Sequence, residues 1–117
     1  LAADRATQGV HSFYKPTHPS IIRMIHHVVK EANQSETPLS LCGEMASDPL
    51  MTPLLIGLGV RKLSCASRYI PLIRKMVSQV DVEEAVALAG EILKLETSEQ
   101  VDNLLKEKYQ KIVLEIS

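Results

Sequence analysis

The sequence contains the stretch Leu39-Ser40-Leu41-Cys42-Gly43-Glu44-Met45-Ala46-Ser47-Asp48-Pro49, in which a short apolar run ends in a thiol, a glycine and a carboxylate. This run predicts a strand over residues 39–42. Asp48 and Pro49 are typical of an N-cap and a first helical position, and predict a helix over residues 49–58. Parallel α/β proteins place functional side chains at the carboxyl ends of strands, which makes Cys42 a candidate. The alternative is that Cys42 is only a small buried apolar residue.

The remaining chain reads as helices around a second, weaker strand. Apolar residues recur at a helical period from Ser20, and Pro19 suits the first turn of that helix. Capping patterns at Asp81 and Thr97 predict two C-terminal helices. The expected elements are a turn at 10–14, helices at 20–32, 49–58, 69–77, 82–95 and 101–116, and strands at 39–42 and 60–66. This order predicts βα units of a parallel sheet, whose missing strands must come from elsewhere because two strands cannot cover both faces.

The length of 117 residues predicts at most one domain, residues 1–117. The net charge of −1 and the absence of Trp give no case for nucleic acid or for an anionic membrane surface. Two cysteines outside any Cys-x-x-Cys pair favour reduced thiols and a cytoplasmic location. No apolar run reaches the roughly 18 residues of a spanning helix. The start at Leu1, without a Met, is expected of a piece of a longer protein.

Several motifs resemble those of the phosphoenolpyruvate-utilising enzymes, and enzyme I of the bacterial phosphotransferase system in particular. The central stretch is similar to the family signature Cys-Gly-Glu-(Met/Leu)-Ala-Gly-Asp-Pro. Four further matches follow in order along the chain: Ala2-Ala3-Asp4-Arg5; the Tyr14, Pro16, His18 and Pro19 positions; Pro53-Leu54-Leu55-Ile56-Gly57-Leu58-Gly59; and Ile70-Pro71. The resemblance therefore covers nearly the whole chain.

The resemblance implies a fold and an activity. The fold is the C-terminal part of a (β/α)₈ TIM barrel, about two βα units followed by C-terminal helices. The activity is Mg²⁺-dependent transfer of phosphate from phosphoenolpyruvate to an enzyme histidine, and then to a histidine phosphocarrier protein, for sugar uptake. The phosphorylated histidine and the metal ligands are expected outside this chain, so no metal ligand is assigned here. The isolated fragment is expected to be inactive, and the family implies a homodimer.

The resemblance also implies roles for individual residues. Cys42 matches the acid–base residue that exchanges a proton with carbon 3 of pyruvate or its enolate. A neutral thiol, with a reference pKa of about 8.5, is mostly protonated at neutral pH and can donate that proton. Arg5, beside Asp4, matches the arginine that holds the phosphate, since a guanidinium offers a planar fork of donors. Ala6-Thr7 departs from the family pattern of Gly or Met followed by Asn.

Other polar residues have plainer interpretations. Glu44 either supports the thiol through hydrogen bonds or helps cap the next helix. Gly43 allows a tight turn under both interpretations. A structural or solvated role is expected for each of the four histidines, with His18 in a helix-start motif. The basic residues are expected on a solvated face; they are Arg61, Lys62, Arg68, Arg74 and Lys75.

Three alternatives remain open. The Cys-Gly-Glu motif is similar in pyruvate phosphate dikinase and phosphoenolpyruvate synthase, although residues 81–109 resemble the enzyme I type. Ser40-Leu41-Cys42 slightly favours a nitrogen-branch paralogue of enzyme I. A non-catalytic helical dimerisation module is the alternative from a different functional class, because helices with much apolar surface need cover.

Overall fold

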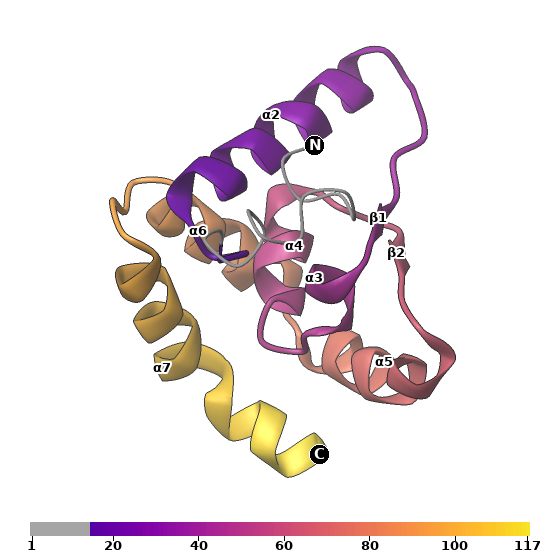
Figure 1. Cartoon of the computed structure of the whole chain (residues 1–117), viewed down its shortest axis with the longest axis vertical. Coiled ribbons are helices and arrows are strands. Elements are labelled where there is room, and N and C mark those ends of the chain that lie inside the picture. Colours follow the sequence, from indigo (N-terminus) through magenta and orange to yellow (C-terminus); the bar gives the residue numbers. More distant parts are fainter. Residues whose placement is uncertain (1–14) are drawn as a thin grey trace.

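The computed structural model describes residues 15–117. This part of the chain is mostly helical and contains a small parallel sheet (Figure 1). Its elements, in order, are α2 (Pro19–Gln34), β1 (Leu41–Cys42), α3 (Glu44–Ser47), α4 (Thr52–Leu58), β2 (Leu63–Ser64), the 3₁₀ helix η2 (Ser67–Tyr69), α5 (Ile70–Gln79), α6 (Val82–Ile92) and α7 (Ser98–Ile116). The arrangement is compatible with a fragment of an α/β domain.

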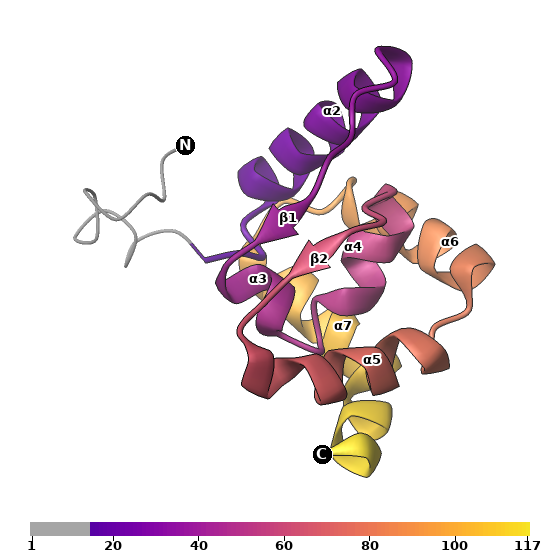
Figure 2. The same cartoon turned by 90° about the vertical axis from the view of Figure 1, so that its right-hand side faces the viewer.

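The sheet consists of β1 and β2, which run parallel as the sequence predicts. Leu41 is paired with Leu63, and Cys42 with Ser64. Both leucines pack against the apolar core, whereas Cys42 and Ser64 are exposed. Because successive side chains of a strand point to opposite faces, the sheet has one covered and one open face. Figure 2 shows the two strands side by side, with α4 behind them.

Both strands are shorter than predicted. Hydrogen bonding of each strand to the other is limited to residues 41–42 and 63–64 and the bond from the Leu41 N–H to the Lys62 carbonyl oxygen (2.9 Å). Among the described residues, each strand pairs only with the other. The apolar residues that flank the two strands lie outside the paired segment. The predicted strand pair is therefore confirmed, but its predicted length is not.

The predicted helix over residues 49–58 is wrong at its start. The Asp48 carboxylate accepts a hydrogen bond from the Leu50 N–H (2.9 Å), and so caps a turn before the helix. Helix α4 begins at Thr52, with Pro53 in its first turn as predicted. The short helix α3, which precedes this turn, was not predicted. The Asp-Pro signal therefore marks a turn between two helices, because one side chain caps a turn and a helix equally well.

Helix α4 is the centre of the apolar core. Leu54 and Leu55 are fully buried, as a helix apolar on most sides requires. A side chain at Gly57 would overlap the carbonyl oxygen of Ala85, so α4 and α6 pack with their backbones close together. At the end of α4, Gly59 adopts a left-handed conformation (φ +102°), and the Val60 N–H reaches back to the Leu55 carbonyl oxygen (3.0 Å).

The N-caps of three other helices are confirmed. The His18 side chain accepts a hydrogen bond from the Ser20 N–H (3.1 Å) at the start of α2. Asp81 accepts one from the Glu84 N–H (3.2 Å) at the start of α6. Thr97 and Gln100 form a complete capping box at the start of α7. Each of these hydrogen bonds spans two or three residues, which is why the sequence reveals them.

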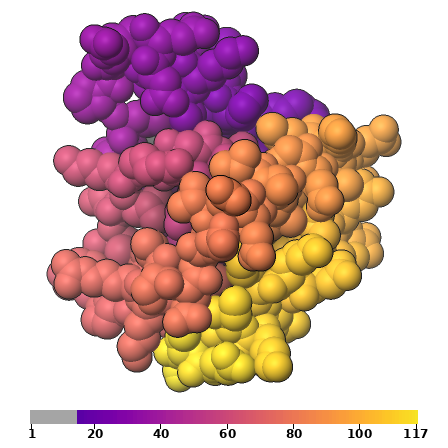
Figure 3. Space-filling model, turned by 180° about the vertical axis from the view of Figure 1, so that it is seen from behind, coloured from indigo at the N-terminus to yellow at the C-terminus, as the bar shows by residue number. Residues whose placement is uncertain are grey.

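Helices α6 and α7 complete the core. Helix α6 contacts α4, and α7 contacts α5. Seen from behind, α6 and α7 lie on the near face of the molecule, beside α5 (Figure 3). Their buried side chains include Leu88, Ile92, Val101, Leu105 and Tyr109. Helix α6 ends at Ile92, three residues before the predicted end, and α7 begins at Ser98. Within residues 15–117, no helix is both long and apolar enough to span a membrane.

Candidate functional site

Cys42 lies at the carboxyl end of β1, on the open face of the sheet. Its side chain is exposed, and its paired neighbour Ser64 is exposed beside it. The thiol is free of any disulfide. Its position is therefore unlike that of the buried apolar cysteine that the sequence left open as an alternative, and solvent reaches the sulfur.

Gly43 turns the chain directly after the thiol. Its φ of +95° lies in the region that side-chain-bearing residues rarely adopt. A Cβ at this position would meet nothing within 4 Å, so the backbone conformation alone requires glycine here. The Ser47 hydroxyl donates a hydrogen bond to the Gly43 carbonyl oxygen (3.2 Å), which ties the turn to the end of α3.

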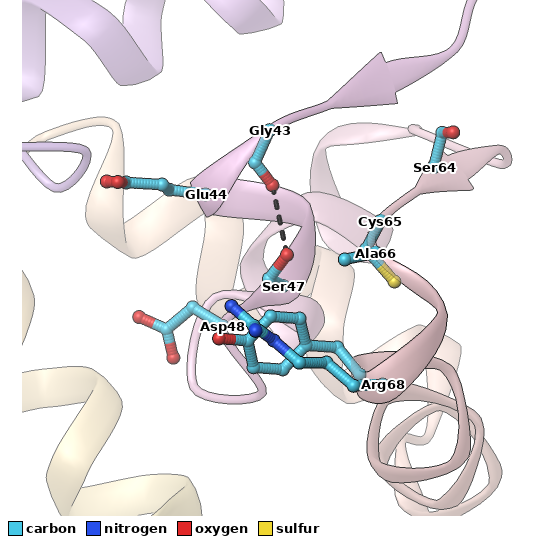
Figure 4. A pocket seen from close by; sticks show the side chains of 9 residues that line it. Gly43, Glu44, Ser47, Asp48, Ser64, Cys65, Ala66 and Arg68 are labelled. Carbon is cyan, nitrogen blue, oxygen red and sulfur yellow. Dashed lines mark hydrogen bonds between the residues drawn. The ribbon is translucent and has the colours of Figure 1, made fainter.

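Glu44 begins α3 and is exposed. A carboxylate in the first turn of a helix interacts favourably with the unpaired N–H groups there, as the capping interpretation requires. In Figure 4 the Glu44 side chain points away from Cys65. Glu44 also lines a pocket at the strand ends, although Cys42 is not among the residues that line it, so the role of Glu44 as a supporting residue stays a prediction.

A pocket of about 560 Å³ lies where β1 and β2 end (Figure 4). Segments after both strands contribute to it, as expected for an α/β site at the carboxyl edge of a parallel sheet. The first segment follows β1, and the second follows β2. The lining residues are Gly43, Glu44, Ser47, Asp48, Ser64, Cys65, Ala66, Arg68 and Tyr69.

The contribution of the segment after β2 was not predicted from the sequence. Cys65 is half-buried, and the Arg68 guanidinium lies 4.9 Å from the centre of the Tyr69 ring. Arg68 had been assigned only to a solvated basic face. The signal that marks these residues is their position, since they follow β2 as Gly43 and Glu44 follow β1.

Arg61 differs from the other members of the basic run. Its guanidinium donates hydrogen bonds to the carbonyl oxygens of Ile56 (2.8 Å) and Val60 (3.1 Å). These carbonyls lie at and just beyond the end of α4, where free carbonyl groups need donors. The side chain is exposed as predicted, but it has a structural role.

Arg5, the predicted phosphate-binding residue, and Asp4, its predicted supporting neighbour, lie outside the described residues, as do His11 and the predicted turn at residues 10–14. Among the described histidines, His18 caps α2, and His27 lies 3.9 Å from the Glu31 carboxylate on the surface of the same helix. Residues 15–117 contain no group of three or more His, Cys, Asp or Glu side chains placed to hold a metal ion.

Residues 1–82 match the family described as PEP-utilising enzyme, PEP-binding domain, and this match covers 82 of the 117 residues. The chain belongs to this family of PEP-utilising enzymes. The matched segment includes both strands, the thiol and every residue that lines the pocket. The C-terminal helices α6 and α7 lie almost entirely beyond it.

Curated relatives carry the name phosphoenolpyruvate-protein phosphotransferase. The protein from Chlamydia trachomatis serovar D is 43% identical over 88 residues, which cover 75% of this chain and 15% of the relative. The proteins from Listeria monocytogenes and Bacillus subtilis are 38% and 34% identical, and the matches cover 93% and 94% of this chain and 19% of each relative. The chain therefore spans less than a fifth of the length of these PEP-utilising enzymes.

Proposed function

We propose that this chain is part of a phosphoenolpyruvate–protein phosphotransferase, an enzyme that moves phosphate from phosphoenolpyruvate to its own histidine and on to a histidine phosphocarrier protein, for sugar uptake. Membership of the PEP-binding domain family supports phosphoenolpyruvate as the substrate. The names of relatives at 34–43% identity favour the phosphotransferase over the dikinase and synthase of the same family. The histidine and the phosphocarrier site would belong to other parts of the enzyme.

The proposed fold of the whole domain is a (β/α)₈ barrel, with residues 1–117 as its C-terminal part. The open face of the sheet supports this proposal, because Cys42 and Ser64 lie exposed on it. In a barrel that face is the interior, and the strands that cover it would come from the preceding part of the enzyme. The isolated fragment would then lack a complete site and would be inactive.

One observation carries the assignment of Cys42: an exposed thiol at the carboxyl end of β1, followed directly by a glycine turn and a pocket. When phosphate leaves phosphoenolpyruvate, the remaining enolate has an electron-rich carbon 3. That carbon takes the proton of the Cys42 thiol, the C=C electrons form the new C–H bond, and the enolate oxygen becomes the ketone oxygen of pyruvate. The thiolate that remains takes a proton from water, which restores the neutral thiol.

Magnesium is the metal ion proposed for the whole enzyme. Residues 15–117 contain no group of three or more His, Cys, Asp or Glu side chains placed to hold a metal ion, so no magnesium ligand is proposed among them. No step assigned to this chain therefore passes through the metal. Its ligands would come from the part of the enzyme that precedes this chain.

The experiment for Cys42 uses the full-length enzyme. Cys42→Ala is expected to lower the rate of pyruvate formation from phosphoenolpyruvate by about 10²–10⁴-fold, the usual contribution of a general acid. Cys42→Ser is expected to be similarly slow, because a hydroxyl is a much weaker acid than a thiol. The affinity for phosphoenolpyruvate, measured by calorimetry, should stay close to that of the unchanged enzyme.

Ser40→Ala is the matched control, since Ser40 is an exposed residue just before β1 and is not among the residues that line the pocket. It should turn over phosphoenolpyruvate normally. Normal pyruvate formation by both Cys42 variants would remove the thiol from the mechanism.

Arg5, with Asp4 beside it, is proposed to hold the phosphate of the substrate. Arg5→Ala should raise the KM for phosphoenolpyruvate at least tenfold, because a guanidinium binds an oxyanion through two parallel hydrogen bonds. An unchanged KM would contradict this role.

A homodimer is proposed for the whole enzyme, and sedimentation at several concentrations tests it.

A further inference from the structure

We propose that Arg68 is a second anion-binding residue of this site, one that contacts an oxyanion of phosphoenolpyruvate, either its carboxylate or its phosphate. This inference rests on the proposed function, and it adds a residue that neither the motifs nor the relatives' names assign. It starts from the place of Arg68 in the fold. Arg68 lies in η2, four residues after Ser64 ends β2, and lines the pocket at the strand ends.

The Arg68 side chain is available to a ligand. It makes no hydrogen bond or ion pair with any other residue in the described part of the chain, and its guanidinium lies 4.9 Å from the centre of the Tyr69 ring. Arginine stacked on an aromatic face is held in place while its N–H donors stay free at the edge of the guanidinium plane. Arg61 is the contrasting case, because its guanidinium donates to two backbone carbonyls.

The charged residues that line the pocket indicate a role for Arg68 in binding an anion. Among the described residues, the pocket lining contains two carboxylates, Glu44 and Asp48, and a single cation, Arg68. Figure 4 shows the Arg68 side chain reaching from the β2 side toward Ser47 and Asp48. A ligand with a carboxylate and a phosphate would be repelled by the Asp48 carboxylate. A guanidinium at the same pocket offsets that repulsion and offers two parallel donors to an oxyanion.

The competing interpretation is that Arg68 only neutralises the pocket carboxylates. The Asp48 carboxylate forms no ion pair with Arg68 within 4.0 Å, and it already accepts a hydrogen bond from the Leu50 N–H (2.9 Å). The unpaired guanidinium therefore favours an external anion.

The test measures the dissociation constant of phosphoenolpyruvate for the full-length enzyme by calorimetry. Arg68→Gln is expected to weaken binding about tenfold, the size of one lost charge-assisted contact at an exposed position. Arg68→Lys keeps the charge but loses the planar fork of donors. Its affinity for phosphoenolpyruvate should therefore lie between that of the unchanged enzyme and that of Arg68→Gln. Arg74→Gln is the matched control, because Arg74 is an exposed arginine on α5 that is not among the residues lining the pocket.

Two simpler anions identify the group that Arg68 contacts. If Arg68→Gln weakens the binding of pyruvate but not that of inorganic phosphate, Arg68 contacts the carboxylate. If it weakens the binding of inorganic phosphate but not that of pyruvate, Arg68 contacts the phosphate. Steady-state kinetics of the same variant should show a raised KM with a nearly unchanged kcat, because the contact is made in the bound substrate as well as in the transition state.

The failures of the two proposals are distinguishable. If the unchanged enzyme binds phosphoenolpyruvate and Arg68→Gln binds it equally well, the role of Arg68 is overturned while the proposed function stands. If the unchanged enzyme does not bind phosphoenolpyruvate, the proposed function itself falls, and the role of Arg68 with it. A drop in affinity for Arg74→Gln equal to that of Arg68→Gln would also overturn the inference, since it would reflect net charge alone.

Discussion

The strand ends and the helical core of this molecule differ in how far their side chains are buried. At the strand ends, β1 and β2 pair over two residues each, and Cys42, Glu44 and Arg68 are exposed. In the core, side chains such as Leu54 and Leu55 on α4 are completely buried. The strand ends therefore contribute little apolar burial, while the core contributes most of it.

The residues that stabilise the fold are therefore different from the residues that could bind substrate or carry chemistry. Polar side chains at the strand ends flank a glycine turn, which is fixed by the hydrogen bond from the Ser47 hydroxyl to the Gly43 carbonyl oxygen (3.2 Å). They stay accessible because the helices pack on the opposite face of the sheet. We expect substitutions in the core to unfold the protein, and substitutions at the strand ends to change binding or turnover at nearly constant stability.

The largest expected effect on stability comes from shortening a core leucine. Leu55→Ala should lower the free energy of unfolding by about 2–5 kcal/mol, because it leaves a cavity that the surrounding helices cannot fill. Leu41→Ala, on the covered face of β1, should cost about 1 kcal/mol, since Leu41 is only half-buried and water can fill the space. Urea unfolding followed by circular dichroism measures both. Equal losses would erase the proposed difference between the two regions.

Gly57→Ala is expected to have the next largest effect. The new methyl group would overlap the Ala85 carbonyl oxygen, so α4 and α6 must move apart, at a cost of about 1–3 kcal/mol. Gly90→Ala is the matched control within α6, where an added Cβ meets nothing within 4 Å. There the substitution should stabilise by about 0.5–1 kcal/mol through helix propensity. Thermal unfolding of the two variants should therefore shift in opposite directions.

The smallest expected effect concerns Tyr109 on α7, at alkaline pH. Burial raises the pKa of the Tyr109 hydroxyl above its usual value of 10.0, and the negative charges of Glu84 and Asp81 raise this pKa further. Above pH 10 the unfolded chain loses this proton before the folded chain does. The free energy of unfolding therefore falls as pH rises through this range.

Tyr109→Phe removes this titration, and its stability should fall less steeply between pH 9 and pH 11, measured by urea unfolding at each pH. Glu84→Gln, which removes the larger of the two charge effects, should give an intermediate slope. Identical slopes for the unchanged protein and Tyr109→Phe would show that the buried hydroxyl does not contribute to alkaline unfolding.

Much of the fold could be predicted because its signals are local. The His18, Asp81 and Thr97 caps bond to N–H groups two or three residues away, and the predicted parallel pairing of two strands is confirmed. The start of α4 was misplaced because Asp48 caps the turn that precedes the helix. Local signals identify a cap, but they do not say whether a turn or a helix follows it.

The candidate site was only half predictable. The motif at Cys42 and Glu44 was recognised as it stands in the sequence, and Gly43 proves to need its glycine for a positive φ. Cys65 and Arg68 were not singled out as part of a site. Their membership in the pocket depends on the register of β2 against β1, and no pattern within residues 63–69 reveals that register.

The sequence by itself determined the family, the order of helices and strands, and most helix starts, because motifs and caps are written in neighbouring residues. Only the tertiary structure decided that Cys42 lies on the open face, that α4 and α6 meet at Gly57, and that Arg68 joins Glu44 at one pocket. These facts depend on strand register and helix packing, which bring together residues far apart in the chain.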